Sequence, residues 1–154
     1  MGSSIAVVGP GAIGSTVAAY LHASGQPVLL CGHTPREHLD VRADDAAPII
    51  VPGPVHTDPA DIAAPVDAVM LAVKATQIDD AGRWLMALCD EHTVVCVLQN
   101  GVEQVELVSP HCPASRVYPR SSGSPPKRNL EAGCGCAGSR GSRCPLPAAW
   151  WPIC

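Results

Sequence analysis

Residues 4–14 read Ser-Ile-Ala-Val-Val-Gly-Pro-Gly-Ala-Ile-Gly, and this stretch decides the fold. The apolar run of residues 4–9 is short and ends in glycine, which predicts a buried β-strand. The apolar spacing of residues 12–24 predicts a helix directly after this strand, and Gly25 stands in the usual helix-stop position. A strand that leads through a glycine-rich turn into a helix is typical of a parallel α/β sheet.

Strands and helices alternate along the rest of the chain as well. Apolar runs and helical spacing predict further elements, which are strands at residues 27–31, 66–74 and 93–98 and helices at residues 76–88 and 102–108. In residues 39–57, β-prone fragments between Asp, Pro and Gly predict a small hairpin. The sequence therefore predicts an α/β fold, a Rossmann-like doubly wound parallel sheet with helices on both faces.

Each of the two longer predicted helices carries apolar side chains on one face, which we expect to pack on the sheet. These side chains are Ile13, Val17, Tyr20 and Leu21 on the first helix, and Ile78, Ala81, Leu85 and Leu88 on the helix of residues 76–88. Because aromatic residues make up only 3% of the chain and Phe is absent, the core must consist of Val, Leu, Ile and Ala. Such a core suits a parallel sheet covered by helices.

The composition changes abruptly near residue 119. Residues 1–119 hold 5 Lys and Arg against 13 Asp and Glu, whereas residues 120–154 hold 5 against 1. The last part of the chain is rich in Pro, Gly, Ser, Arg and Cys and shows neither helical nor strand periodicity. We therefore expect one domain over residues 1–118 and an irregular, disordered tail over residues 119–154.

The glycine-rich turn matches the G-x-G-x-x-G pattern with Gly9, Pro10, Gly11, Ala12, Ile13 and Gly14. It stands between a predicted strand and a predicted helix, as a dinucleotide-binding loop requires. In such a loop Gly9 permits the tight turn, Gly11 lets the backbone approach a pyrophosphate, and Gly14 lets the helix pack closely on the sheet. The N–H groups and the positive end of the helix hold the anion. The alternative is a tight turn with a structural role alone.

The end of the second predicted strand indicates which dinucleotide binds. A site that prefers NAD usually has Asp or Glu there to bind the ribose hydroxyls. This chain has Cys31-Gly32-His33-Thr34-Pro35-Arg36, with no acidic residue before Glu37. Thr34 and Arg36 can hydrogen-bond a 2′-phosphate that a carboxylate would repel, so we expect NADPH as the cofactor. The alternative is that Arg36 is an ordinary solvated charge.

Two further motifs make the prediction more specific. Val73-Lys74-Ala75-Thr76-Gln77 follows the strand of residues 66–74, and Leu98-Gln99-Asn100-Gly101-Val102 follows the strand of residues 93–98. A glycine loop followed by these two motifs resembles the ketopantoate (2-dehydropantoate) reductases over about residues 4–118. The resemblance implies that NADPH reduces a small-molecule substrate, ketopantoate, to pantoate in pantothenate and coenzyme A biosynthesis.

The resemblance also assigns roles to Lys74 and Asn100, which in that family face the nicotinamide and the substrate. Both follow predicted parallel strands at the carboxyl end, where ligands of open α/β sheets bind. Lys74 can attract an anionic keto acid, and Asn100 can donate and accept hydrogen bonds. The alternatives are a solvated strand-end charge for Lys74 and a turn residue for Asn100. Many relatives carry Arg in place of His33, which predicts weaker NADPH binding or a larger share for Arg36.

The family's second domain is helical and supplies a general acid and a substrate-binding Glu, but residues 119–154 match none of it. In a shifted reading frame with GC-rich codons, residues 120–127 yield AVVWFSAE and residues 133–137 yield WVRLR, which resembles the family's continuation. Our hypothesis is that the tail is a frameshift product and that the chain alone reduces ketopantoate negligibly. The DNA sequence across codons 116–120 tests it, and the absence of a family frame downstream would contradict it.

Other functions find less support in the sequence. No apolar run approaches the roughly 18 residues that span a bilayer, and the start lacks a basic signal region, so we expect a cytoplasmic protein without a membrane partner. The basic tail can bind nucleic acid only nonspecifically.

The tail also contains four cysteines that are candidate zinc ligands, namely Cys134, Cys136, Cys144 and Cys154. Their spacing differs from that of structural zinc sites, so we predict no metal. The remaining alternatives are a non-catalytic nucleotide-binding remnant and another NADP-dependent 2-hydroxyacid reductase.

Overall fold

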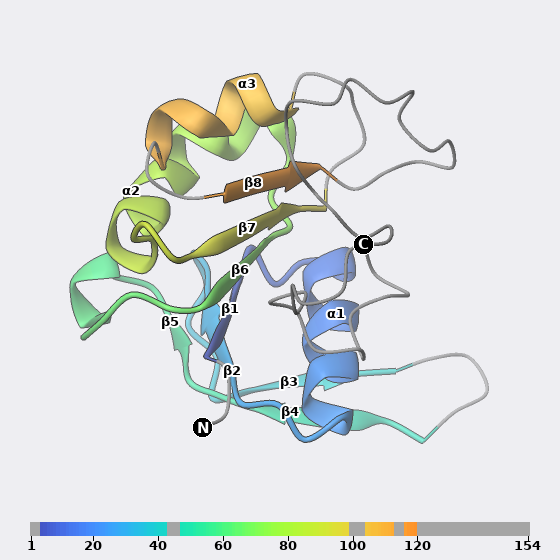
Figure 1. The fold of residues 1–154 in the computed structure, drawn as a ribbon. Coiled ribbons are helices and arrows are strands. Elements are labelled where there is room, and N and C mark those ends of the chain that lie inside the picture. The colour runs from blue at the N-terminus through green and yellow to red at the C-terminus, as the bar shows by residue number, and fades with distance from the viewer. Residues whose placement is uncertain (1–3, 43–46, 99–103, 113–115, 120–154) are drawn as a thin grey trace, which may run out of the picture. The chain divides into compact units, whose positions relative to one another are not determined.

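The computed structural model describes residues 4–42, 47–98, 104–112 and 116–119, which all belong to one compact unit (Figure 1). In chain order its elements are β1 (Ile5–Val8), α1 (Ala12–Ala23), β2 (Val28–Cys31), β3 (His38–Val41), β4 (Ile49–Pro52), β5 (Val55–His56), η1 (Pro59–Asp61), β6 (Ala68–Leu71), η2 (Ala75–Gln77), α2 (Ile78–Leu88), β7 (Val94–Val97), α3 (Gln104–Val108), η3 (Ser109–His111) and β8 (Arg116–Pro119).

The main sheet has six strands in the order β5-β2-β1-β6-β7-β8, and every neighbouring pair is parallel. From β1 the chain first builds outward through β2 to β5, and then returns to the other side of β1 with β6, β7 and β8. The two halves therefore meet between β1 and β6. In open α/β sheets, the carboxyl ends of the strands at such a switch point are where ligands bind.

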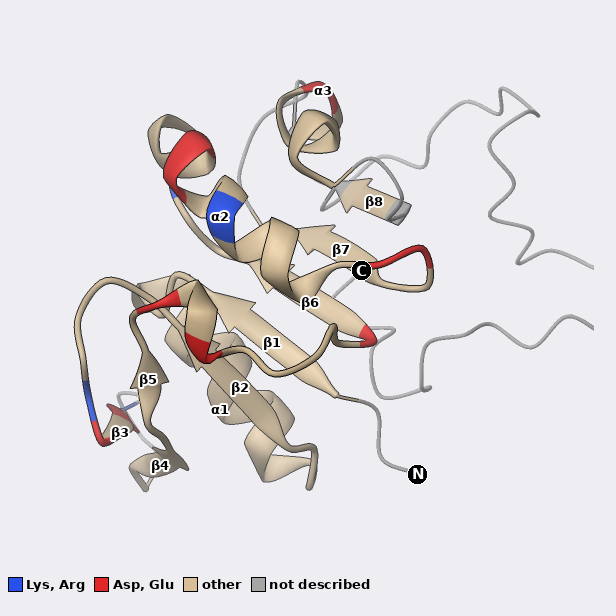
Figure 2. Cartoon of the chain, turned by 90° about the vertical axis from the view of Figure 1, so that its left-hand side faces the viewer, with Lys and Arg blue, Asp and Glu red and all other residues tan. Residues whose placement is uncertain are grey.

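The central strands are apolar along their whole length because helices cover both of their faces. All four residues of β1, β6 and β7 are buried. Figure 2 shows that β1, β2, β6 and β7 carry no charged residue. Helix α1 lies on one face of the sheet, and α2 and α3 lie on the other (Figure 1). The predicted fold class, a Rossmann-like parallel sheet with helices on both faces, is therefore confirmed.

The predicted buried face of the second long helix is also confirmed, since all four of its predicted residues are buried: Ile78, Ala81, Leu85 and Leu88. The prediction for α1 is wrong in part. Ile13 is 46% exposed and Tyr20 68% exposed, whereas Gly14, Ala18 and Leu21 are buried. These three residues follow the i, i+4, i+7 spacing of one helix face. The helix turns this face inward because it approaches the sheet through Gly14, where a Cβ would overlap the Gly9 carbonyl oxygen.

Residues 39–57 form the predicted hairpin only in part. Strands β3 and β4 pair in an antiparallel manner in a separate two-stranded sheet. The last fragment, which contains Val55, instead forms β5 and joins the main sheet beside β2, with Val55 opposite Leu30. Strand β8, which was not predicted, extends the other edge of the sheet beside β7. Both edge strands, β5 and β8, join the sheet by pairing with a neighbouring strand. Their sequences are too short to show a clear periodicity.

Part of the predicted organisation lies outside the described residues. This applies to residues 120–154, which make up most of the predicted tail, and to the motif residue Asn100. The boundary after residue 118 and the irregularity of the tail therefore stay predictions. Within the part of the chain that the structure describes, no helix is long and apolar enough to cross a membrane.

Candidate functional site

A cavity of about 470 Å³ opens at the carboxyl ends of β1, β2 and β6, where the two halves of the sheet meet. It brings together most of the residues that the sequence predicts for a cofactor site. The lining residues are Gly9, Pro10, Gly11, Ala12, Ile13, Gly32, His33, Thr34, Arg36, Ala72, Val73, Lys74 and Gln77. The glycine loop, the end of β2 and the end of β6 thus form three walls of one site.

Two of the three loop glycines are required by the packing of the protein itself. Gly9 has a φ of +85°, and a Cβ there would lie 2.7 Å from the Cγ1 atom of Val73 and 3.1 Å from its backbone nitrogen. Gly14 lies in the first turn of α1, where a Cβ would overlap the carbonyl oxygen of Gly9 and lie 3.1 Å from the Cβ atom of Ala72. Any larger residue at either position would push the loop or the helix away from β6.

The third loop glycine has no such packing role. A Cβ on Gly11 would meet no atom within 4 Å, and Gly11 lines the cavity. Its φ of −77° is open to every residue type. The fold of the described residues therefore does not require glycine at this position. A ligand that has to approach the backbone closely does require it.

The start of α1 is suited to an anion. Gly11 is the N-cap residue but provides no side-chain cap, and the first turn holds no acidic residue. The Gly11 N–H donates to the carbonyl of Gly9 at 2.8 Å, so the N–H groups of Ala12, Ile13 and Gly14 are the ones without an intrahelical acceptor, and of these residues Ala12 and Ile13 line the cavity. Helix α2, by contrast, has Asp79 and Asp80 in its first turn. Among the helices that the structure describes, α1 alone thus directs a positive end without a nearby carboxylate into the cavity.

The end of β2 forms the second wall. His33, Thr34 and Arg36 are exposed and line the cavity. The backbone that carries them is anchored, because the Val55 N–H donates to the Arg36 carbonyl at 2.8 Å. Gly32 packs against the glycine loop, since a Cβ there would lie 2.9 Å from the Cδ atom of Pro10. The polar side chains therefore extend from a fixed segment of backbone.

The end of β6 forms the third wall. The N–H of Lys74 donates to the Oε1 atom of Gln77 at 3.2 Å, and the Gln77 N–H donates to the Lys74 carbonyl at 2.8 Å. These two bonds close a turn that holds the backbone at Lys74 while its side chain is exposed at the cavity. Gln77 belongs to the motif of residues 73–77, but neither its role nor that of Gly32 was predicted from the sequence.

The charges around the cavity differ in sign from those of the whole chain. The chain has a formal net charge of −4, yet no Asp or Glu lines the cavity. Arg36 and Lys74 are cationic, and His33 can become so. Neither Arg36 nor Lys74 forms an ion pair with another described residue. The site is therefore prepared for an anionic ligand.

Cys31 lies directly beneath this site but takes no part in its chemistry. Burial raises the pKa of the Cys31 thiol to about 12. The thiol therefore stays protonated at neutral pH and is neither a nucleophile nor a metal ligand. The backbone carbonyl of Cys31 instead helps to fix the glycine loop, because it accepts a hydrogen bond from the Gly9 N–H at 2.9 Å. Among the described residues, no group of three or more His, Cys, Asp or Glu side chains is placed to hold a metal ion.

The strand order, the parallel pairing and the glycine turn together define the class of this domain, which is Rossmann-like. Residues 5–123 match the family described as "Ketopantoate reductase PanE/ApbA". The chain belongs to this ketopantoate reductase family.

Individual relatives agree with this assignment. The 2-dehydropantoate 2-reductase of Mycobacterium tuberculosis (strain ATCC 25618 / H37Rv) is 65% identical over 119 residues, which are 77% of this chain and 40% of the relative. The 2-dehydropantoate 2-reductase of Caulobacter vibrioides is 38% identical over 128 residues, which are 82% of this chain and 43% of the relative. The chain thus spans about two-fifths of the length of the curated relatives that it matches.

Solved structures show the same fold. A dimeric ketopantoate reductase from Staphylococcus aureus has a TM-score of 0.63 and 28% sequence identity, over 77% of this chain and 43% of that chain. D-mandelate dehydrogenase, solved with NADH and anilino(oxo)acetate, has a TM-score of 0.65 and 24% identity, over 76% of this chain and 40% of that chain. The second likeness concerns the fold alone.

Gly9 is required by the packing of the loop and Gly11 is not, so replacing them should change the stability of the protein to different extents. Gly9→Ala should lower the free energy of unfolding by about 2 kcal/mol or more, because the residue has a positive φ and no room for a Cβ. Gly11→Ala should lower it by less than about 1 kcal/mol, the cost of a poorer N-cap. Urea unfolding of the two variants and the parent chain measures both values, and equal losses would contradict this assignment.

Proposed function

We propose that the cavity binds NADPH and that this domain is the cofactor-binding part of a 2-dehydropantoate 2-reductase. The observation that carries the proposal is Gly11, a glycine on the cavity wall that nothing in the described fold requires. Beside it stands a helix start with neither a side-chain cap nor an acidic residue. A pyrophosphate that approaches the Gly11 backbone and accepts hydrogen bonds from the N–H groups of Ala12 and Ile13 accounts for both features.

The end of β2 supports NADPH rather than NADH. The cavity wall there offers Thr34 and Arg36 and no carboxylate that would bind ribose hydroxyls and repel a 2′-phosphate. A guanidinium suits phosphate because it donates two parallel hydrogen bonds. One solved structure with a similar fold contains NADH, so the fold by itself does not decide between the two cofactors.

The reaction we assign is the reduction of the ketone of ketopantoate to the alcohol of pantoate. When bound, NADPH would supply the hydride to the ketone carbon, and by the family resemblance the general acid of the second domain would supply the proton to the resulting alkoxide. Lys74 holds a positive charge at the cavity, where it can attract the carboxylate of a keto acid, and the turn closed by Gln77 fixes its backbone. Asn100 follows β7 in sequence, outside the described residues. Its proposed role in bridging the cofactor and the substrate rests on the family resemblance.

Replacing Arg36 should separate the two cofactors. Arg36→Ala should weaken NADPH binding by about tenfold, because a charge-assisted contact to the 2′-phosphate is lost. NADH binding should change by less than about twofold, and fluorescence titration of both cofactors measures the effects. Arg42→Ala is the matched control, since Arg42 is exposed on the β3–β4 hairpin and pairs with Asp40 at 2.8 Å. Equal weakening of both cofactors would contradict a 2′-phosphate role for Arg36.

A chimera tests the reaction. Residues 1–118 of this chain replace the matching part of the M. tuberculosis reductase, which is 65% identical in this region. We expect the chimera to oxidise NADPH when ketopantoate is added, and Lys74→Ala in the chimera to lower kcat/KM by about 100-fold. Arg42→Ala in the same chimera should leave the rate unchanged. A chimera that folds and binds NADPH but does not reduce ketopantoate would contradict the assigned reaction.

A further inference from the structure

We propose that His33 makes the cavity select NADP(H) over NAD(H) more strongly as the pH falls, because its protonated ring supplies a further positive contact to the 2′-phosphate. This inference rests on the proposed function. Beyond the proposed function, it states that the choice between the two cofactors depends on pH through the side chain of His33.

The first observation is the set of charged groups around the cavity. Three lining side chains can carry a charge, namely His33, Arg36 and Lys74. Arg and Lys remain cationic throughout the neutral range, whereas histidine is the side chain whose charge ordinarily changes between pH 5 and 8. Protonation of His33 therefore raises the positive charges on the lining from two to three. Across the neutral range this is the one lining side chain that can change the charge of the site.

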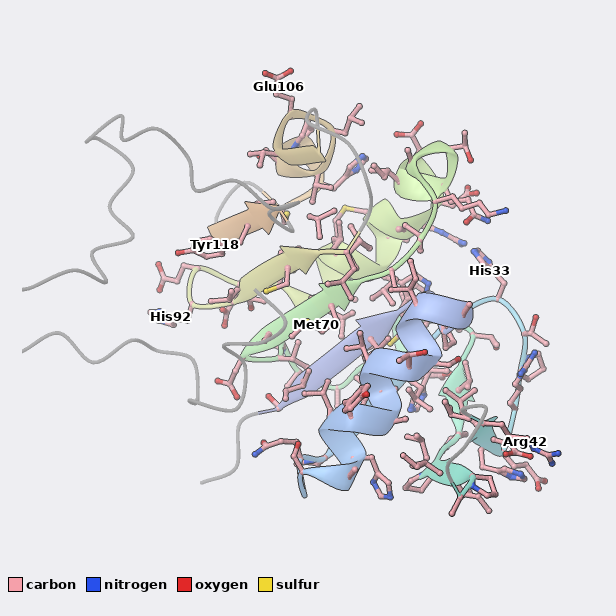
Figure 3. All side chains as sticks on the ribbon, turned by 90° about the vertical axis from the view of Figure 1, so that its right-hand side faces the viewer. His33, Arg42, Met70, His92, Glu106 and Tyr118 are labelled. Carbon is pink, nitrogen blue, oxygen red and sulfur yellow. The ribbon has the colours of Figure 1, made fainter. Side chains whose placement is uncertain are left out.

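The second observation is the position of His33. Figure 3 shows it beside the first turn of α1, at the opposite end of the sheet from His92. It stands on the same anchored loop as Thr34 and Arg36, at the carboxyl end of β2. That strand end is where a Rossmann-like domain meets the adenosine ribose, whereas the glycine loop meets the pyrophosphate. The charge of His33 thus acts where NADP and NAD differ.

The third observation concerns the groups that surround His33. On its own loop are Arg36 and Glu37, and Glu37 is exposed and does not line the cavity. The first turn of α1 contributes no acidic residue, and the end of β6 contributes Lys74. On β5, the Nδ1 atom of His56 lies 3.9 Å from an Asp61 carboxylate oxygen. Within the described part of the chain, His33 itself has no ion pair with a carboxylate.

The direction of the effect follows from this environment. A bound 2′-phosphate at this wall of the cavity stabilises a positive charge on the ring, so nucleotide binding favours proton uptake by His33. By linkage, protonation favours nucleotide binding to the same extent. NADP should therefore bind more tightly, relative to NAD, at lower pH.

Isothermal titration calorimetry on the full chain tests the proposal. NADP⁺ and NAD⁺ are titrated at pH 6, 7 and 8 and constant ionic strength, into the parent chain and the variants His33→Gln, His33→Arg and His92→Gln. The NADP⁺-to-NAD⁺ affinity ratio of the parent should exceed that of His33→Gln by about tenfold at pH 6 and by less than about twofold at pH 8. The His33→Gln chain shows how protonation of the phosphate itself changes the affinity ratio in the absence of the imidazole.

The control variants sharpen the result. His33→Arg should keep a high ratio at every pH relative to His33→Gln, and His92→Gln should match the parent because His92 is exposed at the far end of the sheet. If the ratio for His33→Gln follows the same pH curve as the parent, the inference is overturned while the proposed function stands. If the folded parent chain binds neither nucleotide, both fail together.

Discussion

The whole site depends on one point of close packing, where the turn after β1 meets the end of β6. Gly9 adopts a φ of +85° and leaves no room for a Cβ beside Val73. Because Gly14 in the first turn of α1 has no Cβ, the helix can begin almost in contact with the Gly9 carbonyl. This packing directs the start of α1 toward the carboxyl ends of the strands. The N-terminal end of α1 and the ends of β2 and β6 share one cavity as a consequence.

Electrostatics then gives this cavity its character. The chain is acidic overall, and acidic residues stand at the start of α2 and in the loops, but none lines the cavity. A positive region in an acidic molecule favours an anionic ligand and leaves the other surfaces less attractive to it. Arg36 and Lys74 supply the charges from the ends of two strands, and the helix end adds its partial charge between them.

Much of this arrangement could be predicted from the sequence, because the buried parallel strands are uninterrupted apolar runs and the glycine spacing has one main use between a strand and a helix. The inward face of α1 could not be predicted in the same way. It is set by the contact of Gly14 with Gly9 rather than by the positions of large apolar residues. The place of β5 in the main sheet and the strand β8 were missed, because both depend on pairing with a neighbouring strand. The roles of Gly32 and Gln77 likewise depend on contacts that local sequence does not reveal.

The family assignment and the cavity lead to one central claim, that the glycine loop holds the pyrophosphate of NADPH. Fluorescence titration of NADPH into the parent chain and into folded Gly11→Ala tests it most directly. We predict saturable binding to the parent chain and at least about tenfold weaker binding to the variant, because its new methyl group occupies the space that the pyrophosphate needs. Equal binding of NADPH to the two chains would contradict the claim.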